Sequence, residues 1–153
     1  MAMSVRRANA DDIPQLAELV SSLAGFYLDD PNTELPAWFK ETISEPAFEA
    51  RIKSQDYVNI LYENAGRVEG YAALKDGSHL YHLFVAKSQQ RTGIATLLWR
   101  SLLTYCHADL VTVRSSMYAV PVYERFGFTV ERPAGLKDGI AFQPLVLKLN
   151  HRG

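Results

Sequence analysis

The sequence is poor in several features that would mark special classes of protein. It contains a single cysteine, Cys106, so no internal disulfide bond can form, and a reducing compartment is the simpler expectation. No stretch reaches about 18 consecutive apolar residues, and the N-terminal segment lacks the apolar centre of a secretory signal. Basic residues are not in excess, with 16 Lys and Arg against 17 Asp and Glu. These absences predict a cytoplasmic protein with no membrane partner and no nucleic-acid partner.

The remaining composition is that of a globular protein. The chain has 153 residues, of which 48% are hydrophobic and 22% are charged. This balance supplies one sizeable core and is too apolar for intrinsic disorder. We therefore expect a single domain over residues 1–153.

The first third of the chain predicts a strand, a helix and a region of mixed character. A short strand is expected at residues 3–8, followed by a helix capped by Asp11. Residues 25–46 mix aromatics, acids and prolines, which favours a loop with short helices, and a further helix should close over residues 48–52. The first helix carries an apolar stripe made of Ile13, Leu16, Leu19, Val20 and Leu23.

The remaining two thirds predict strands interrupted by two helices. Turn residues separate three β-rich runs, which indicates an antiparallel meander. The element order favours an α/β (α+β) protein with a mixed sheet and helices on its faces, and an exposed C-terminal strand would allow a homodimer. We expect strands at 57–62, 68–74, 79–85, 110–114, 129–132 and 140–149, and helices at 93–105 and 119–126, the second ending at Gly127.

One segment has the pattern of an anion-binding loop. Leu83-Phe84-Val85 reads as a buried strand, and a polar loop then leads into an amphipathic helix near Gly93. The free N–H groups of a helix start can receive a phosphate, Gly93 allows a close backbone approach, and Arg91 can add a charged contact. An ordinary strand-to-helix connection is the alternative. The segment is neither a P-loop nor a Rossmann fingerprint.

Two segments together resemble the GNAT superfamily of acyl-CoA-dependent N-acyltransferases. Gln90, Gly93 and Ala95 match its signature Gln/Arg-x-x-Gly-x-Gly/Ala, and the strand before it resembles the family's central strand, which ends in a bulge. Tyr123-Glu124-x-x-Gly127-Phe128 resembles its second familiar stretch. The resemblance implies a three-layer α/β/α fold with a mostly antiparallel sheet, and acetyl-CoA as acyl donor with no metal. It places the donor on Leu83, Phe84, Val85, Gln90, Arg91, Thr92, Gly93, Ile94, Ala95, Thr96 and Ser116.

The chain departs from the family at one contact. Many members carry an Asn at the end of the strand before the second helix, where it touches the pantetheine arm of the donor. Here Arg114, Ser115 and Ser116 occupy that region, and either serine could supply the hydrogen bond.

The resemblance also suggests the acid and the base. Tyr123 aligns with the tyrosine that many members use to protonate the leaving thiolate, although without the motif it would read as a core tyrosine. His79 and Tyr81 share a strand face near the family's usual base, and His79 could equally be a structural histidine. His82 should point the other way and pack.

The sequence says least about the acceptor of the acyl group. The resemblance implies direct transfer of an acetyl group to a primary amine of a small molecule or peptide; a non-catalytic acyl-CoA-binding or regulatory module on the same fold is the alternative. Acids in the N-terminal loops could attract a cationic amine or simply be solvated, and the nearby aromatics could line a pocket or fill the core. These residues are Asp29, Asp30 and Glu34, and Phe26, Tyr27, Trp38 and Phe39.

Overall fold

The fold is built on one mixed sheet. The computed structural model describes residues 3–23, 35–138 and 140–149. The strand order is β1-β2-β3-β4-β5-β8-β6, with β7 also paired to β8, and among these pairs β4 with β5 is parallel while the others are antiparallel. The strands are β1 (Met3–Arg7), β2 (Tyr57–Asn64), β3 (Arg67–Lys75), β4 (His79–Val85), β5 (Leu110–Ser116), β6 (Thr129–Val130), β7 (Gly135–Lys137) and β8 (Ile140–Lys148).

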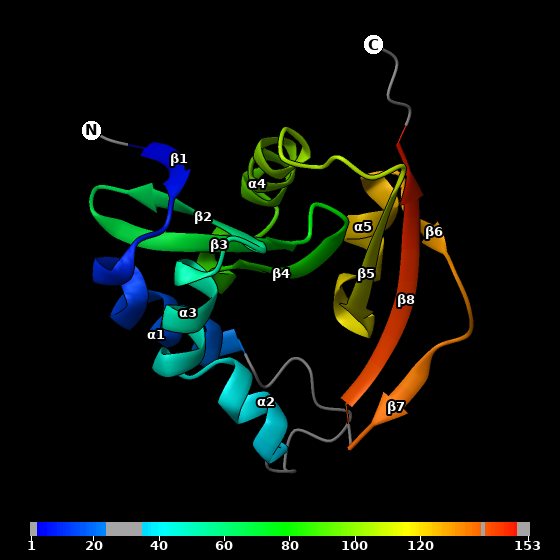
Figure 1. Ribbon diagram of the computed structural model, residues 1–153, viewed down its shortest axis with the longest axis horizontal. Helices are drawn as coiled ribbons and strands as arrows, with labels where there is room; N and C mark the ends of the chain where they lie inside the picture. The colour runs from blue at the N-terminus through cyan, green and yellow to red at the C-terminus, as the bar shows by residue number, and fades with distance from the viewer. Residues whose placement is uncertain (1–2, 24–34, 139, 150–153) are drawn as a thin grey trace.

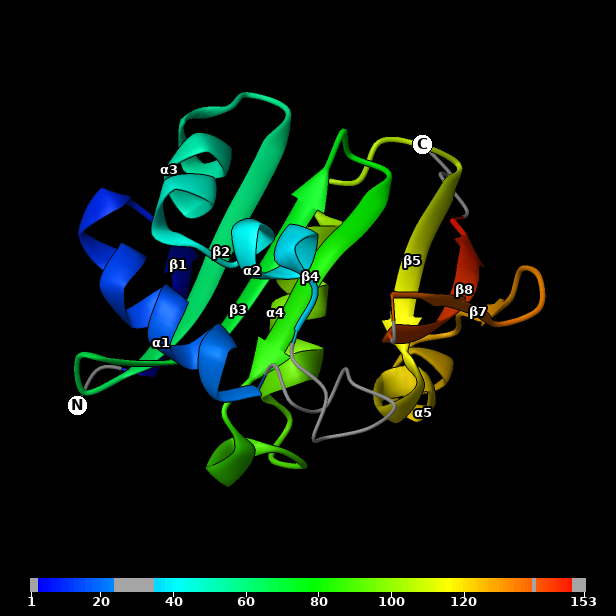
Figure 2. The same cartoon turned by 90° about the horizontal axis from the view of Figure 1, so that it is seen from below.

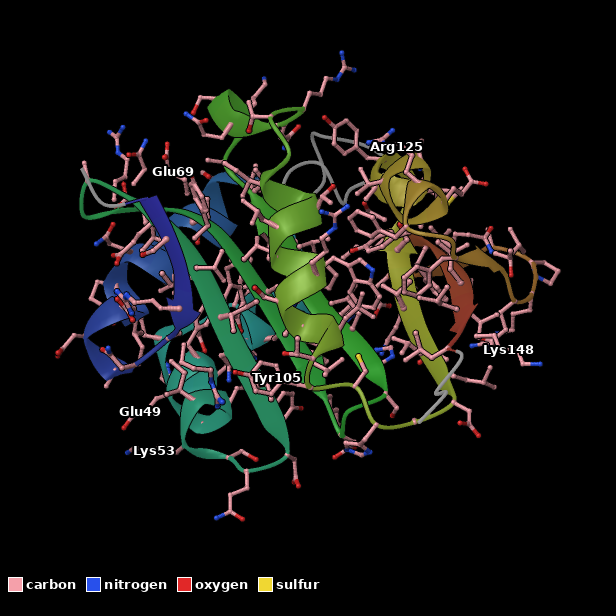
Figure 3. All side chains as sticks on the ribbon, turned by 90° about the horizontal axis from the view of Figure 1, so that it is seen from above. Glu49, Lys53, Glu69, Tyr105, Arg125 and Lys148 are labelled. Atoms are coloured by element: carbon pink, nitrogen blue, oxygen red, sulfur yellow. The ribbon has the colours of Figure 1, made fainter. Side chains whose placement is uncertain are left out.

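Helices cover both faces of this sheet, which confirms the predicted three-layer class (Figure 1). One face carries α1, α2 and α3, and the other carries α4 with α5 beside it (Figure 3). No helix in the described ranges is both long and apolar enough to cross a membrane. The helices are α1 (Ile13–Leu23), α2 (Ala37–Thr42), α3 (Glu45–Lys53), α4 (Ile94–Leu103) and α5 (Val120–Arg125), with short 3-10 turns η1 (Ala10–Asp12), η3 (Lys87–Gln89) and η4 (Met117–Ala119).

The apolar stripe predicted for α1 is buried in full, but the cap differs from the prediction. All five stripe residues lie in the core beneath the sheet. The chain turns into α1 through η1, and the side chain of Asn9, not Asp11, caps that turn. Asn9 Oδ1 accepts from the backbone N–H of Asp11 at 2.9 Å, and Asp12 Oδ2 accepts from the N–H of Asn9 at 2.8 Å. This reciprocal pair forms a capping box that starts one turn before the apolar stripe.

An ion cluster attaches β1 to its neighbours. The guanidinium of Arg6 donates two hydrogen bonds to Asp12, at 2.8 and 2.9 Å, and two to Glu63, at 2.9 and 3.2 Å. The Arg6 contact, opposed in part by burial, lowers the pKa of the Asp12 carboxyl. Asp12 therefore has two roles. It completes the capping box, and with Arg6 and Glu63 it forms the ion cluster, called here the Arg6 clamp, that joins β1, η1 and β2.

Helix α4 lies directly on β3 because of a glycine. A Cβ atom added at Gly70 would lie 2.9 Å from Leu98 Cδ1 and 3.1 Å from Ile94 Cγ2. The missing side chain thus lets the first turns of α4 sit close to the sheet. This contact fixes the start of α4 relative to the end of β4.

A β-bulge in β4 changes which side chains share a face. Ala73 of β3 pairs with His82 and Leu74 pairs with Leu80, so Tyr81 is an extra residue. The bulge thus lies within the strand and not at its end, and it places His82 on the same side as Tyr81. Their ring centroids are 4.5 Å apart, and the His82 ring is 5.1 Å from that of Phe84. The expectation that His82 points away from this face is wrong, although its ring does pack.

Strands β4 and β5 separate soon after they meet. They pair only at His79 with Thr112 and Leu80 with Val113. Beyond these pairs the two strands diverge, and α5 lies below the open end (Figure 2). The backbone of β4 from Tyr81 onward is therefore left without a ladder partner on its β5 side.

The C-terminal part differs from its prediction in two ways. The sequence did not indicate β7, and β6 stops at Val130, shortly before Pro133, which cannot donate a ladder hydrogen bond. Strand β8 lies between β5 on one side and β6 and β7 on the other. It is not the exposed edge on which the predicted homodimer rested.

Candidate functional site

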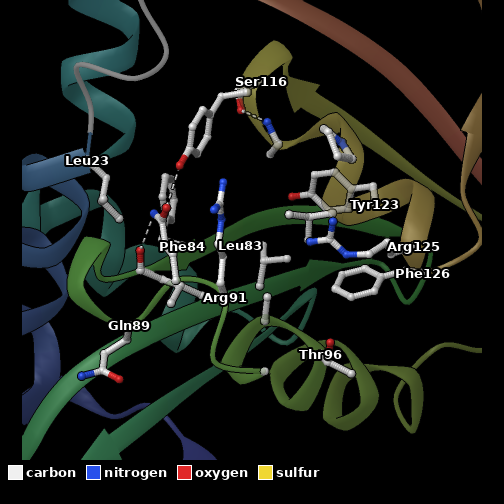
Figure 4. A pocket seen from close by; sticks show the side chains of 18 residues that line it. Leu23, Leu83, Phe84, Gln89, Arg91, Thr96, Ser116, Tyr123, Arg125 and Phe126 are labelled. Carbon is white, nitrogen blue, oxygen red and sulfur yellow. Dashed lines mark hydrogen bonds between the residues drawn. The ribbon is translucent and has the colours of Figure 1, made fainter.

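The loop after β4, the start of α4 and helix α5 enclose a cavity of about 270 Å³, named here the loop cavity (Figure 4). Residues from seven elements and the loops between them line it, and most belong to the two predicted motifs. The lining residues are Leu23, Leu83, Phe84, Val85, Gln89, Gln90, Arg91, Gly93, Ala95, Thr96, Ser116, Tyr118, Ala119, Pro121, Val122, Tyr123, Arg125 and Phe126.

The backbone of this loop is shaped to present N–H groups. Arg91 and Gly93 have φ values of 68° and 91°, in the left-handed region, and Gly93 is the N-cap of α4. No side chain in the described part of the chain caps the helix, and the N–H of Leu97 donates to the carbonyl of Gly93 at 3.1 Å. A Cβ atom added at Gly93 would meet nothing within 4 Å. The helix start thus offers free donors and its positive dipole end to an anion.

The charged side chains around the loop cavity are positive. Arg91 contributes from the loop and Arg125 from α5, and both are exposed (Figure 4). Among the described lining residues there is no Asp or Glu. An anionic ligand would meet two guanidinium groups and a helix N-terminus without a competing carboxylate.

Gln90 bridges the two sides of the loop cavity. Its Nε2 donates to the carbonyl of Val85 at 3.2 Å, and its Oε1 accepts from the hydroxyl of Tyr118 at 2.7 Å. The side chain therefore ties the end of β4 to η4. These two hydrogen bonds hold the loop in place.

Two predicted binding residues do not line the loop cavity with their side chains. Ile94 is 5% exposed and packs in the core between the sheet and α4. The Thr92 hydroxyl donates to the carbonyl of Gln89 and stabilises the loop. The other predicted donor residues all line the cavity.

A second cavity of about 460 Å³, named here the histidine cavity, lies on the α2 side of the same strands. It contains both histidines of β4 and residues contributed by β5, β7, β8 and α2. The lining residues are Trp38, Phe39, Thr42, Lys75, His79, Tyr81, His82, Leu83, Phe84, Val113, Arg114, Ser116, Ala119, Tyr123, Lys137, Ile140, Ala141 and Phe142.

The surroundings of His79 in this cavity favour its neutral imidazole. Its Nδ1 is 2.7 Å from the hydroxyl of Thr112, the β5 residue with which His79 pairs in the sheet. Burial lowers the pKa of His79, and the positive charges of Arg114 and Lys75 lower it further. A Thr112 hydroxyl that accepts from Nδ1–H leaves Nε2 as the basic nitrogen.

The other two ring side chains on this face of β4 are packed. The hydroxyls of Tyr81 and Thr42 are 3.0 Å apart, and the Tyr81 ring lies edge-on to that of Tyr57. Nε2 of His82 is buried and has no hydrogen-bond partner among the residues that the structure describes, and burial lowers the pKa of His82 well below its usual range. Of the three, His79 is the group best suited to exchange a proton in the cavity.

The two cavities meet at Leu83, Phe84, Ser116, Ala119 and Tyr123, which line both. Tyr123 is 5% exposed, and its ring packs edge-on against Phe126 and Phe128. Its hydroxyl points toward the loop cavity (Figure 4) and has no hydrogen-bond partner in the described part of the chain. Burial raises the pKa of Tyr123 above its ordinary value. A protonated, unpaired hydroxyl therefore stands at the junction of the two spaces.

The structure distinguishes the two serines at the end of β5. Ser115 is 1% exposed, and its hydroxyl donates to the carbonyl of Ser116 at 2.6 Å. Ser116 lines both cavities, and its Oγ accepts from the N–H of Ala119 at 3.2 Å. Only Ser116 is placed to contact a ligand at the junction.

The lone cysteine lies outside both cavities. Cys106 packs in the core beneath α4 and its Sγ is 3.6 Å from the carbonyl of Leu102. Burial raises the pKa of the thiol, so the thiolate is disfavoured. The described residues also contain no cluster of three or more His, Cys, Asp or Glu able to hold a metal ion.

The residues expected near an acceptor divide into two groups. Trp38 and Phe39 line the histidine cavity, and Phe39 also belongs to the core beneath the sheet, so both readings of the aromatics apply to it. Phe26, Tyr27, Asp29, Asp30 and Glu34 lie outside the described residues.

Several site residues were missed because long-range pairing brings them in. Lys137 and Phe142 reach the histidine cavity through the β7–β8 hairpin, and Lys75 through the end of β3. Arg125 lies within the second motif. Its basic side chain, on the same helix as Tyr123, could have indicated from the sequence that it lines the loop cavity.

Comparison with known proteins agrees with this geometry. The family model described as an acetyltransferase (GNAT) domain matches residues 27–149. No curated protein matched the sequence at a significant level.

Three solved structures illustrate the shared fold. A GCN5-related N-acetyltransferase from Rhodopseudomonas palustris is 23% identical, with a TM-score of 0.79 over 97% of this chain and 99% of that one. The PaiA N-acetyltransferase of Thermoplasma acidophilum, solved with coenzyme A, is 18% identical with a TM-score of 0.73 over 97% and 100%. YncA of Salmonella typhimurium, solved with acetyl-CoA, is 20% identical with a TM-score of 0.74 over 100% and 97%.

Proposed function

The chain belongs to the GNAT family of acetyltransferases, and from this premise we propose that it transfers the acetyl group of acetyl-CoA directly to a primary amine of a small molecule or peptide. The observation that carries the proposal is the meeting of two cavities at Tyr123. One cavity suits an anionic donor and the other holds a neutral histidine. A donor thioester and an acceptor amine could thus approach each other at one protonated hydroxyl.

In this proposal the loop cavity holds the donor. The N–H groups at the start of α4 would bind the pyrophosphate, with Arg91 and Arg125 adding charge. The edge of β4 around Leu83, which has no β5 strand partner, would pair with the amide groups of the pantetheine arm. Ser116 would contact that arm where many relatives carry an asparagine. PaiA and YncA, solved with coenzyme A and acetyl-CoA, support this choice of donor.

The chemistry would follow at the junction. Nε2 of His79 would take a proton from the attacking ammonium, directly or through water, and the neutral nitrogen would add to the thioester carbonyl. As the C–S bond breaks, Tyr123 would give its proton to the departing thiolate sulfur, and the second proton lost by the acetylated nitrogen would restore the Tyr123 hydroxyl. Tyr81, whose hydroxyl is engaged with Thr42, would shape the acceptor space. Cys106 lies outside both cavities, so we propose no acyl-cysteine intermediate.

A substitution at Gly93 tests the donor site. In Gly93→Asp a carboxylate would project into the open space beside the helix start, where a Cβ meets nothing within 4 Å. Two unit charges about 4 Å apart repel by about 1–4 kcal/mol between bulk water and a protein surface, or roughly 5- to 1,000-fold in affinity. Calorimetric titration with acetyl-CoA should show this loss.

The matched control is Gly66→Asp. Gly66 lies in the β2–β3 turn, also has a positive φ of 80°, and also has open space around its Cβ position. The two variants therefore carry a similar backbone strain, and the control should bind acetyl-CoA like the wild type. Equal affinity in Gly93→Asp and the wild type would place the donor elsewhere.

A further inference from the structure

Three charged side chains are among the described residues that line the histidine cavity, and all three are basic. They are Lys75 at the end of β3, Arg114 on β5 and Lys137 on β7. None of the three has a carboxylate partner within the described residues. Each instead lies over an aromatic ring, at 5.8 Å from Tyr57, 5.3 Å from Phe142 and 4.5 Å from Trp38 respectively. Among the described residues, the positive charge on the cavity wall is thus held over aromatic rings and is not paired with a carboxylate.

Carboxylates are missing from this wall in the part of the chain that the structure describes. No Asp or Glu is among the described lining residues. The carboxylate of Asp138 is engaged beside the cavity, where its Oδ2 accepts from Trp38 Nε1 at 2.8 Å. The whole chain has a net charge of −1, so the positive potential is a local property of this cavity.

A fourth cation lies behind the cavity wall. Arg51 is 6% exposed, and within the described ranges its Nε and Nη2 have no hydrogen-bond partner. Its guanidinium carbon is 5.5 Å from the ring centroid of Tyr81, which lines the cavity. A buried charge without a counter-charge is costly, and an anion bound nearby would reduce that cost.

We infer that the acceptor amine also carries an anionic group, and that Arg114, with Lys75 and Lys137, binds this group in the histidine cavity. The inference rests on the proposed acetyl transfer and names its substrate class. The guanidinium of Arg114 provides a fork for a carboxylate or a phosphate, and the two ammonium groups add point charges. The aromatic rings of Trp38 and Phe142 would contact an apolar part of the same molecule.

This arrangement has a consequence for the reacting nitrogen. Positive charges near an ammonium group favour its neutral form, which is the form that attacks the thioester. The cavity therefore selects an amine by its acidic group and helps to deprotonate it. Polyamines, which carry only positive charges, should be poor acceptors.

The experiment compares acceptors that share an amine and differ in charge. One set is phenylalanine, phenylalaninamide and phenethylamine; a second is phosphoethanolamine and ethanolamine; spermidine is the cationic probe. Thiol release from acetyl-CoA is measured with the wild type, Arg114→Gln, Arg114→Lys and the control Arg100→Gln. Arg100 is exposed on α4 and lines neither cavity, so its variant removes the same charge elsewhere. The two sets distinguish a carboxylate from a phosphate.

The expected result is a preference for the anionic member of at least one set. For that substrate Arg114→Gln should raise KM roughly 10- to 100-fold, the cost of one charged contact, while kcat changes little. Arg114→Lys should recover part of this loss, and Arg100→Gln should match the wild type. Circular dichroism confirms that each variant is folded.

Two other results have separate meanings. If amides, ethanolamine or spermidine are acetylated as well as the acidic amines, or if Arg114→Gln affects all acceptors alike, the inference is wrong and the acetyltransferase function stands. If no amine releases thiol although acetyl-CoA binds, the proposed function itself is refuted.

Discussion

Replacing Tyr123 by phenylalanine isolates the proposed acid. The ring is 5% exposed and packs edge-on against two phenylalanine rings, and phenylalanine keeps those contacts. The hydroxyl has no hydrogen-bond partner in the described residues, so its removal leaves no buried group unsatisfied. The free energy of unfolding should therefore change by less than about 1 kcal/mol.

The catalytic effect of the same change should be large. General acid catalysis typically contributes about 10²–10⁴-fold, so kcat should fall by that factor, or about 3–5 kcal/mol in the activation free energy. Because burial raises the pKa of Tyr123, the wild-type hydroxyl should stay protonated to beyond about pH 10. The wild-type rate should then show no loss from this group across the neutral and mildly alkaline range.

The assay is thiol release from acetyl-CoA with an accepted amine, run beside calorimetric titration of acetyl-CoA and thermal unfolding. Tyr105→Phe is the control, since Tyr105 is 40% exposed beyond the end of α4 and lines neither cavity (Figure 3). Wild-type turnover by Tyr123→Phe, with the chemical step shown to limit the rate, would make Tyr123 a packing residue and refute the reasoning.

Two further predictions concern ionisable groups. In His79→Gln the low-pH limb of kcat/KM should disappear with a loss of activity; in the wild type this limb should lie below about pH 6.5, because burial and nearby cations lower the pKa of His79. Retention of the wild-type limb would assign the base to another group. Asp12→Ala removes the cap and the Arg6 clamp, so urea unfolding at neutral pH should show about 1–3 kcal/mol less stability. The pKa of Asp12 is lowered in the folded state, so its stabilisation is present above about pH 4 and is lost as pH falls through the folded value. A difference from the wild type that persists unchanged at about pH 2 would contradict this assignment.

Local sequence patterns predicted the elements whose signals are local. The five-residue stripe of α1 follows helical spacing and is buried in full, and the turn residues correctly separated β2, β3 and β4. Gly127, with a φ of 102°, ends the second helix region as a C-terminal glycine should. These features need no information from distant parts of the chain.

Features that depend on strand partners could not be predicted in this way. The bulge at Tyr81 exists only in the pairing of β3 with β4, and it reverses the expected side of His82. The approach of Lys137 to the cavity of Arg114 likewise depends on the β7–β8 hairpin and on β8 pairing with β5. The basic character of the described lining of the histidine cavity therefore became visible only with the topology.

The central claim is direct acetyl transfer between the two cavities, and labelled acetyl-CoA tests it most directly. The protein is mixed with trideuteroacetyl-CoA and an acidic amine. Mass spectrometry follows the labelled acetyl group in the amine, in acetyl-CoA and in the intact protein, and also follows the release of coenzyme A. The account predicts that the label appears on the amine nitrogen as coenzyme A is released, with no labelled protein on the way. Label that accumulates first on Cys106, or that never leaves bound acetyl-CoA, would contradict the account.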